Sequence, residues 1–314
     1  MKVHSVLLAV LFVALLGGLA QAQTLQERID ILWQRAERQA ELGKLDDALE
    51  SANRAVELAP ESPDAWWLMG WTRAVRDEFS QAEDAYKRAL SLASQSADLH
   101  NNLGWVYYAQ GKLDEALGSY TEALRQDPDF SLAYINVGLV LTDKSELEAA
   151  AEVLQRAIDG AETSSRKAQA SNALAYCRAH QGDLKEALRL ARLALGLEQT
   201  NAVYHDTLGV MAILSEQAKQ AEGPLRKAIS LGNMPCSHAA LAYALAKAGD
   251  GAGARKELAA IEPALAARRA CRDLDLCFWA GKAYQELAMP EQAERVFAMA
   301  LECWPTHPWA AEMR

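Results

Sequence analysis

The chain has 314 residues, of which 51% are hydrophobic and 24% are charged, and its formal net charge is -10. That much apolar material excludes a disordered chain. The negative charge argues against binding to nucleic-acid phosphates and for neutral or basic partners. Proline accounts for only 9 residues, and alanine, leucine and glutamate are frequent, which favours helix over strand.

The N-terminus has the order of a secretory signal. Lys2 supplies a positive charge, an unbroken apolar run extends from Val6 to Leu16, and Ala20-Gln21-Ala22 gives the small-x-small pattern of a cleavage site. The run is shorter than the ~20 residues that span a bilayer. We therefore expect residues 1–22 to be a signal peptide and the mature chain to be periplasmic or secreted. The alternative is an uncleaved membrane anchor.

Small residues recur through the rest of the chain at intervals of 33 to 39 residues, most often 34. The central series is Ala48, Ala82, Ala116, Ala150, Ala187, Ala221, Ala254 and Ala293. Twelve residues earlier come Ala36, Gly70, Gly104, Gly138, Ala175, Gly209, Ala242 and Gly281. Seven residues later come Ala55, Ala89, Ala123, Ala157, Ala194, Ala228, Ile261 and Ala300. Three small positions in each repeat allow two helices to cross closely, so the period predicts helix pairs.

Larger residues and turn signals keep the same period. Four residues after the central alanine come Ala52, Tyr86, Tyr120, Leu154, Ala191, Leu225, Leu258 and Phe297. The segments GKLD from Gly43, GKLD from Gly111 and GDLK from Gly182 predict the turn inside a pair. Glycine ends the first helix there, and aspartate begins the second. Pro60, Pro128 and Pro305 fall where second helices are expected to stop.

These features resemble the tetratricopeptide repeat family. The first-helix motif is matched by Trp66-Trp67-Leu68-Met69-Gly70 and by the segment from Asn102 to Tyr107. The turn and second helix are matched by GKLDEALGSYTEALRQDP from Gly111 to Pro128. The resemblance implies an all-α, right-handed α-solenoid of about eight helix pairs in a single domain, 23–314. The repeats are expected near 29–62, 63–96, 97–130, 131–164, 168–201, 202–235, 235–268 and 274–307.

The first helices are expected to line the concave groove of the solenoid. The positions facing it lie six, three and two residues before the first small residue and one, four and five after it. They carry Trp33, Trp67, Trp71, Asn101, Asn102, Trp105, Tyr108, Ile135, Asn136, Leu139, Asn172 and Tyr176. Asp30, Asp64, Asp98 and Asp206 add negative charge to this face.

The aromatic and amide side chains predict a peptide-binding groove in repeats one to five, because they can anchor an extended peptide and bond its backbone. Asn102 and Asn136 share one repeat position and would form a short ladder. The alternative is that Trp71 and Trp105 only pack between repeats. Family members that bind chaperone tails clamp a carboxylate with lysine and arginine. Here Trp67, Trp71 and Asn102 occupy those positions, so we expect no such clamp in the N-terminal half.

No group of residues predicts catalysis, a cofactor or a metal site. His100, His205 and His238 share a repeat position that holds Trp66 and Tyr134 elsewhere, so we expect packing rather than chemistry. The glycines between Gly249 and Gly253 follow no strand and therefore lack the context of a phosphate loop. A basic cluster, Arg268, Arg269 and Arg272, is interpreted as a solvated helix end, with an acidic partner as the alternative.

The five cysteines show no CxxC spacing. Export favours disulfides, and Cys236, Cys271, Cys277 and Cys303 are expected at one edge of the solenoid. We expect the pairs 236–271 and 277–303, with 271–277 as a close alternative and five reduced thiols as another. Cys177 is expected to be a buried free thiol.

The sequence thus predicts a non-enzymatic scaffold or peptide-binding adaptor of the cell envelope, with a protein or extended peptide as partner. The alternative is an assembly or regulatory subunit buried in a stable envelope complex. That alternative is favoured by Trp304 and Trp309, because they stand near an end of the solenoid with no long polar cap.

Overall fold

A computed structural model describes residues 25–267, 273–304, 307 and 309–314. Residues 1–22, Arg268, Arg269, Cys271, Arg272 and Pro305 lie outside this range, so the predicted signal peptide and basic cluster do too. The chain divides into two compact units, unit 1 up to Asp127 and unit 2 from Pro128 to Arg314. Each unit is described by itself.

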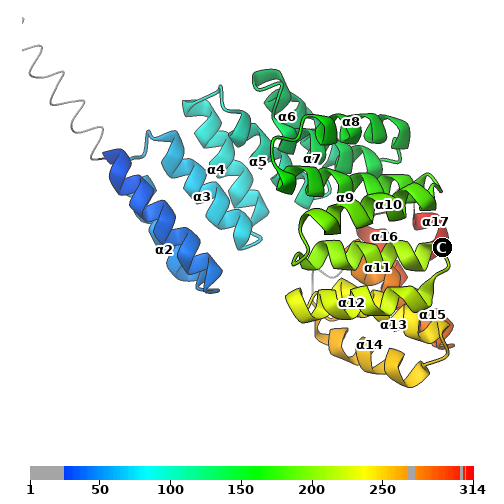
Figure 1. The fold of residues 1–314 in the computed structure, drawn as a ribbon. Helices are drawn as coiled ribbons and strands as arrows, with labels where there is room; N and C mark the ends of the chain where they lie inside the picture. The colour runs from blue at the N-terminus through cyan, green and yellow to red at the C-terminus, as the bar shows by residue number, and fades with distance from the viewer. Residues whose placement is uncertain (1–24, 268–272, 305–306, 308) are drawn as a thin grey trace, which may run out of the picture. The chain divides into compact units, whose positions relative to one another are not determined.

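Unit 1 contains three helix pairs (Figure 1). In the first, residues 25–41 are helical and are followed by α2 (Leu45–Leu58). The second pair is α3 (Pro63–Val75) with α4 (Phe79–Leu92), and the third is α5 (Ala97–Ala109) with α6 (Leu113–Gln126).

Unit 2 contains five further pairs. They are α7 (Ser131–Asp143) with α8 (Leu147–Asp159), α9 (Ser164–His180) with α10 (Leu184–Leu197), α11 (Ala202–Leu214) with α12 (Ala218–Gly232), α13 (Pro235–Lys247) with α14 (Gly251–Leu265), and α15 (Leu274–Glu286) with α16 (Pro290–Cys303). A short helix, α17 (Ala310–Met313), ends the chain. The described residues contain no strand, and the predicted all-helical fold is confirmed.

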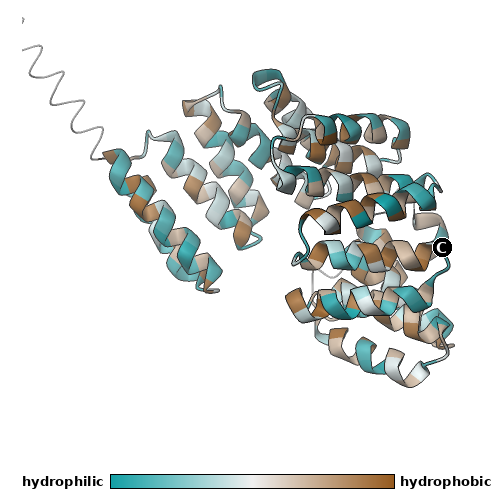
Figure 2. Ribbon diagram, viewed as in Figure 1, coloured by the Kyte–Doolittle hydropathy of each residue, from teal (hydrophilic) through white to brown (hydrophobic). Residues whose placement is uncertain are grey.

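The repeat period corresponds to close helix crossings. Every central alanine is buried, and one face of each second helix is apolar, as the brown stripes in Figure 2 show. The first small residue lies directly against the residue four positions after the central alanine. A Cβ added to Gly104, for example, would lie 2.7 Å from Tyr120 Cε1. The small positions are therefore required by contact between the two helices of a pair.

The sizes of these two contacting residues compensate for each other. Glycine stands opposite Tyr86, Tyr120, Leu154, Leu225 and Phe297. Where alanine replaces glycine, at Ala36 and Ala175, the opposing residues are Ala52 and Ala191. Ala242 opposite Leu258 is the exception. A glycine thus makes room for a large opposing side chain, whereas alanine stands mostly opposite a small one, as close packing demands.

The turn inside each pair contains one residue in the left-handed conformation. Glycine fills it at Gly43, Gly111, Gly182 and Gly249, and Asp77, Ser145, Glu216 and Ala288 fill it in the intervening repeats. At Gly111 the next N–H, from Lys112, donates to the carbonyl of Tyr107 at 2.9 Å, which caps the helix end. The predicted glycine turns are confirmed, and the chain alternates glycine with strained residues.

The predicted aspartate starts of the second helices are partly wrong, whereas two of the predicted proline stops are confirmed. Asp46 and Asp114 lie within the first turn of the second helix rather than at its start. Of the three predicted aspartates Asp183 alone caps its helix, accepting from the Glu186 N–H at 3.2 Å. Pro60 and Pro128 follow the ends of α2 and α6 as expected.

The last pair departs from the stacking seen in the other repeats of each unit. A first helix normally packs on the second helix of the preceding pair, but α15 packs mainly on α13 and barely contacts α14. The chain then returns, and its C-terminal end lies at the level of α9 to α11 rather than beyond α14 (Figure 1). This arrangement brings α15 and the C-terminal segment against the first helices of unit 2, with Trp309 beside His180 of α9 and His307 beside Asp143 at the end of α7.

Candidate functional site

The first helices of unit 1 carry a cluster of three indoles. The ring centroids of Trp33 and Trp67 lie 5.2 Å apart, edge to face, and those of Trp33 and Trp71 lie 6.2 Å apart. All three side chains are half-buried, and Trp33 and Trp71 pack on the core between the first two pairs. We call the first-helix surface formed by these indoles, Trp105 and the neighbouring carboxylates the unit 1 inner face.

Trp105 differs from the other three tryptophans. Its side chain is 44% exposed, and its ring meets Phe79 edge to face at 5.9 Å. Phe79 therefore fixes the indole from one side and leaves the rest of it open. Asn102 and Tyr108 are half-buried beside it along α5, whereas Asn101 is only 4% exposed and has little surface to offer a ligand.

The unit 1 inner face is acidic. Its inward positions carry five carboxylates and neither lysine nor arginine: Asp30, Glu37, Glu41, Asp64 and Asp98. The amide of Gln26 donates to Asp30 Oδ1 and to Asp64 Oδ2, both at 3.0 Å, so two carboxylates from adjacent repeats converge on one neutral donor. Glu37 accepts from Trp33 Nε1 at 2.8 Å. None of the five forms an ion pair within the described residues.

The equivalent positions in unit 2 face other parts of the chain. Asn136 lies half-buried on α7. The side-chain oxygen of Asn172 is buried without a partner, and Tyr176 is enclosed near Asp206 and Asp275, with its hydroxyl bonded to Thr207. Burial, reinforced by these two carboxylates, raises the pKa of Tyr176 well above its ordinary value. The predicted groove residues of repeat five are thus partly covered, with Asp275 at the start of α15 near Tyr176.

The C-terminal segment completes this covering. The ring of Trp309 stacks on Phe278 with centroids 4.2 Å apart and meets Trp279 at 5.7 Å and His180 at 5.2 Å. His307 lies 5.2 Å from the His180 ring and 3.6 Å from Asp143. Trp309 is only 5% exposed. The interpretation as a subunit buried in a larger complex assumed that Trp309 is exposed at the end of the solenoid. Trp309 is instead packed within unit 2, so it no longer favours that interpretation.

Several carboxylates are enclosed between the first helices of unit 2. Burial raises the pKa of Asp206 to about 6, against the opposing hydrogen bond from Ser237. Burial, and then the charges of Asp206, Asp273 and Asp143, raises the pKa of Asp275 well above its ordinary value. Burial thus opposes ionisation of Asp206 and Asp275, so unit 2 is expected to be pH-sensitive.

The histidines at the shared repeat position tie the chain to the preceding turn. His100 contacts the Ser94 carbonyl at 3.4 Å, and His205 contacts that of Gln199 at 3.0 Å. In other repeats Trp66 donates to the Pro60 carbonyl at 2.8 Å, and the Tyr134 hydroxyl donates to that of Pro128 at 3.1 Å. The structural interpretation is confirmed, with a hydrogen bond that spacing alone did not predict. His238 contacts Glu257 and Asn233 instead.

The predicted disulfides are wrong. Cys236 and Cys277 are free, which excludes the pairs 236–271 and 277–303 and the alternative 271–277. Because α15 packs on α13, Cys277 is fully buried there, while Cys236 lies near Asp206 and Asp275. Cys303 is disulfide-bonded. Cys177 is buried and free, as predicted.

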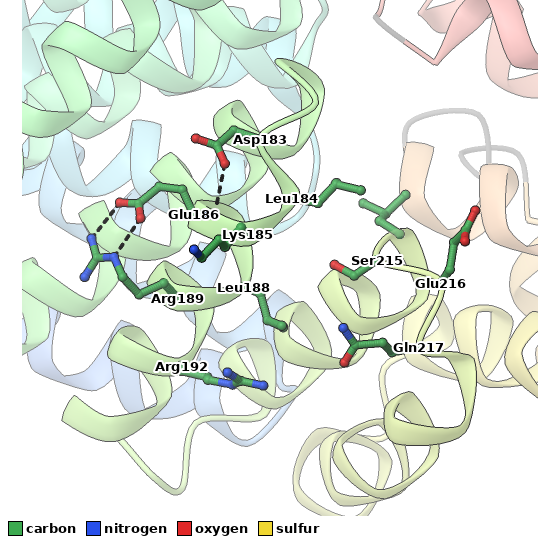
Figure 3. Close-up of a pocket in the computed structure, with 11 residues that line it drawn as sticks. Asp183, Leu184, Lys185, Glu186, Leu188, Arg189, Arg192, Ser215, Glu216 and Gln217 are labelled. Carbon is green, nitrogen blue, oxygen red and sulfur yellow. Dashed lines mark hydrogen bonds and ion pairs between the residues drawn. The ribbon is translucent and has the colours of Figure 1, made fainter.

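Other surfaces offer less. A shallow pocket runs between α10 and the turn that precedes α12 (Figure 3). Its three basic side chains, Lys185, Arg189 and Arg192, are matched in number by three acidic ones, and Arg189 is paired with Glu186 at 2.6 Å. Among the described residues no group of side chains could hold a metal ion, and no helix is both long and apolar enough to cross a bilayer.

Comparisons with known proteins identify the fold. A tetratricopeptide repeat model matches residues 34–97, 101–165 and 143–202. A solved tetratricopeptide repeat protein from Parabacteroides merdae has a TM-score of 0.61 at 16% identity, over 80% of this chain and 98% of its own. PilF of Pseudomonas aeruginosa has a TM-score of 0.54 at 21% identity, over 67% of this chain and 94% of its own. A chain of the Cut9–Hcn1 complex has a TM-score of 0.62 at 17% identity, over 92% of this chain and 54% of its own. No curated protein sequence matches the chain.

Proposed function

The chain belongs to the tetratricopeptide-repeat family, whose members are generally non-enzymatic scaffolds for protein interaction, and from this we propose that it is a peptide-binding adaptor. The proposed site is the unit 1 inner face. The observation that supports it is Trp105, an indole 44% exposed on a first helix and steadied by Phe79. A large aromatic held from one side offers contact area at little cost in conformational entropy, as interface anchors do.

The proposed ligand is an extended segment of neutral to basic character. Half-buried Asn102 and Tyr108 stand on the same helix as Trp105 and can bond a peptide backbone, and the carboxylates of the face repel an acidic segment. We do not propose a second site on unit 2, because Asp275 of α15 and the C-terminal Trp309 lie against its first helices, near Tyr176 and His180. We also propose that residues 1–22 direct export, which places the adaptor in the cell envelope. Mass spectrometry of the native protein should find Gln23 as the first residue.

Peptide display provides the direct test of the site. Random twelve-residue peptides are selected on the wild-type chain and then measured against the double variant Trp71→Ala/Trp105→Ala. We expect the selected peptides to lose at least tenfold in affinity while the helical circular dichroism signal stays unchanged. The variant Leu231→Ala removes an exposed apolar side chain from α12 and should leave binding intact. Equal binding to the double variant would place the site elsewhere.

A further inference from the structure

We propose that the unit 1 inner face selects segments that carry arginine, with one guanidinium between Asp30 and Asp64 and another on the indole of Trp105. This rests on the proposed function of the face as a peptide site, and it names the side chain that is recognised. Two separate pieces of geometry carry it, one for each subsite.

The first subsite is the pair of carboxylates. Asp30 and Asp64 come from neighbouring repeats, and one side-chain amide, that of Gln26, donates to both at 3.0 Å. The donor position between them is thus already occupied by a neutral N–H group on an exposed side chain. A guanidinium has the same planar N–H geometry, offers five donors and adds the positive charge that two carboxylates favour. It would replace the Gln26 amide without moving either carboxylate.

The second subsite is the open part of Trp105. Phe79 meets this ring edge to face, so the indole cannot turn freely to follow a ligand, and nearly half of the side chain remains exposed. Indole is the aromatic ring that attracts cations most strongly, and the flat guanidinium stacks on it better than an ammonium does. Asp98 lies two helical turns earlier on α5, is exposed, and adds negative potential along the path to the ring.

The surrounding charge supports the same ligand. The inward positions of the three repeats of unit 1 hold five carboxylates and no lysine or arginine. Two lysines of this unit are engaged elsewhere: Lys112 and Lys87 both pair with Glu83, at 2.9 Å and 2.7 Å. No basic side chain of the described inner positions therefore competes with a ligand cation, and the charges of face and ligand are complementary.

The spacing of the repeats sets the spacing of the arginines. Neighbouring first helices lie about 8–10 Å apart, and an extended chain rises about 3.3 Å for each residue. Three residues therefore span one repeat. The best probe is a twelve-residue peptide with arginine at every third position and glycine and serine between. Its control is the same peptide with citrulline, which keeps the planar shape but has no charge.

Binding of both peptides to the full chain is measured by calorimetry at 50 mM salt. We expect the arginine peptide to bind at least tenfold more tightly than the citrulline peptide, and the difference to shrink to about threefold at 500 mM, since salt screens exposed charges. The Asp30→Asn/Asp64→Asn variant and the Trp105→Ala variant should each reduce this preference about 2- to 30-fold. The matched control is Glu57→Gln/Asp84→Asn, which removes two exposed carboxylates from the second helices of unit 1 and should leave the preference unchanged.

Three outcomes would overturn the inference: equal binding of the arginine and citrulline peptides, equal binding of a lysine peptide, or an equal loss in the control variant. If the display-selected peptides still depended on Trp71 and Trp105, the proposed function would stand while the preference for arginine fell. If neither those peptides nor the arginine peptide responded to these tryptophans, the proposed function would fall as well.

Discussion

The two units are built from the same repeat, but their inner faces differ in exposure. In unit 1 the inward positions of the first helices hold tryptophans and carboxylates that reach the surface, with Trp105 44% exposed. In unit 2 the first helices are approached by α15 and the C-terminal segment, through Asp275 near Tyr176 and Trp309 against His180, and Trp309 is 5% exposed. Helix crossings and turns have the same register in both. The comparison teaches that the repeat period fixes how helices pair, while the end of the chain decides which inner face is available.

The largest expected difference comes from replacing one tryptophan in each unit. Trp309→Ala removes a ring that packs on Phe278, Trp279 and His180, and should lower the free energy of unfolding of unit 2 by about 3–5 kcal/mol. Trp105→Ala removes a ring that is nearly half exposed and should cost within about 1 kcal/mol. Hydrogen exchange, measured in increasing urea and resolved for each unit, gives the change in the free energy of unfolding for both variants. Similar losses for the two variants would contradict the contrast between a covered and an open face.

The second difference concerns pH. Burial raises the pKa of Asp206 from 3.8 to about 6 in the folded state, so the cost of burying its charge is complete above pH 6 and declines as pH falls from 6 towards 4. Asp206→Asn should therefore stabilise unit 2 by about 2–3 kcal/mol at pH 8, and the gain should shrink steadily as pH falls below 6. Asp98→Asn on exposed α5 should change stability by less than about 0.5 kcal/mol. Denaturant midpoints of both variants from pH 5 to 8 decide the matter, and a gain for Asp206→Asn that is independent of pH would contradict the burial argument.

The helix crossings should respond alike in both units. Gly104→Ala and Gly209→Ala place a methyl group against Tyr120 and Leu225, and each should cost about 1–3 kcal/mol through overpacking. Gly118→Ala, on α6 where an added methyl meets nothing within 4 Å, is the matched control and should be neutral or stabilising. Thermal unfolding provides the measurement. An unchanged melting temperature for Gly104→Ala would mean that the crossing is looser than described.

The smallest effects are expected at the turns, with opposite signs in the two units. Gly111 adopts φ +75 and Ala288 adopts φ 55, both in the left-handed region. Gly111→Ala should destabilise unit 1 by about 1 kcal/mol, whereas Ala288→Gly should stabilise unit 2 by up to about 1 kcal/mol as strain is relieved. Chemical denaturation resolves changes of this size. If both substitutions changed the free energy of unfolding with the same sign, backbone strain at these turns would not explain their effect on stability.

The sequence predicted the pairing of helices because small residues leave a periodic trace. The contacts of Gly104 with Tyr120 and the turn at Gly111 follow directly from that period. The period also predicted the inward positions, yet it could not show that Asn172 and Tyr176 would be covered. Their partial covering depends on α15 packing on α13 rather than on α14. This is a long-range packing preference that leaves no pattern in the local sequence. The disulfide prediction was wrong for the same reason, since it assumed that the last pair continues the regular stack.

The return of the C-terminal segment also has a consequence for synthesis. A regular solenoid can fold as it leaves the ribosome, because each repeat needs only its neighbour. Unit 2 cannot finish in this way, since His307 and Asp143 meet although about half the chain separates them. Its inner face stays uncovered until the last residues have been made, so completion is slow compared with the rest of the array. During that interval the nascent chain exposes Tyr176, and a chaperone that shields such surfaces would act at this stage.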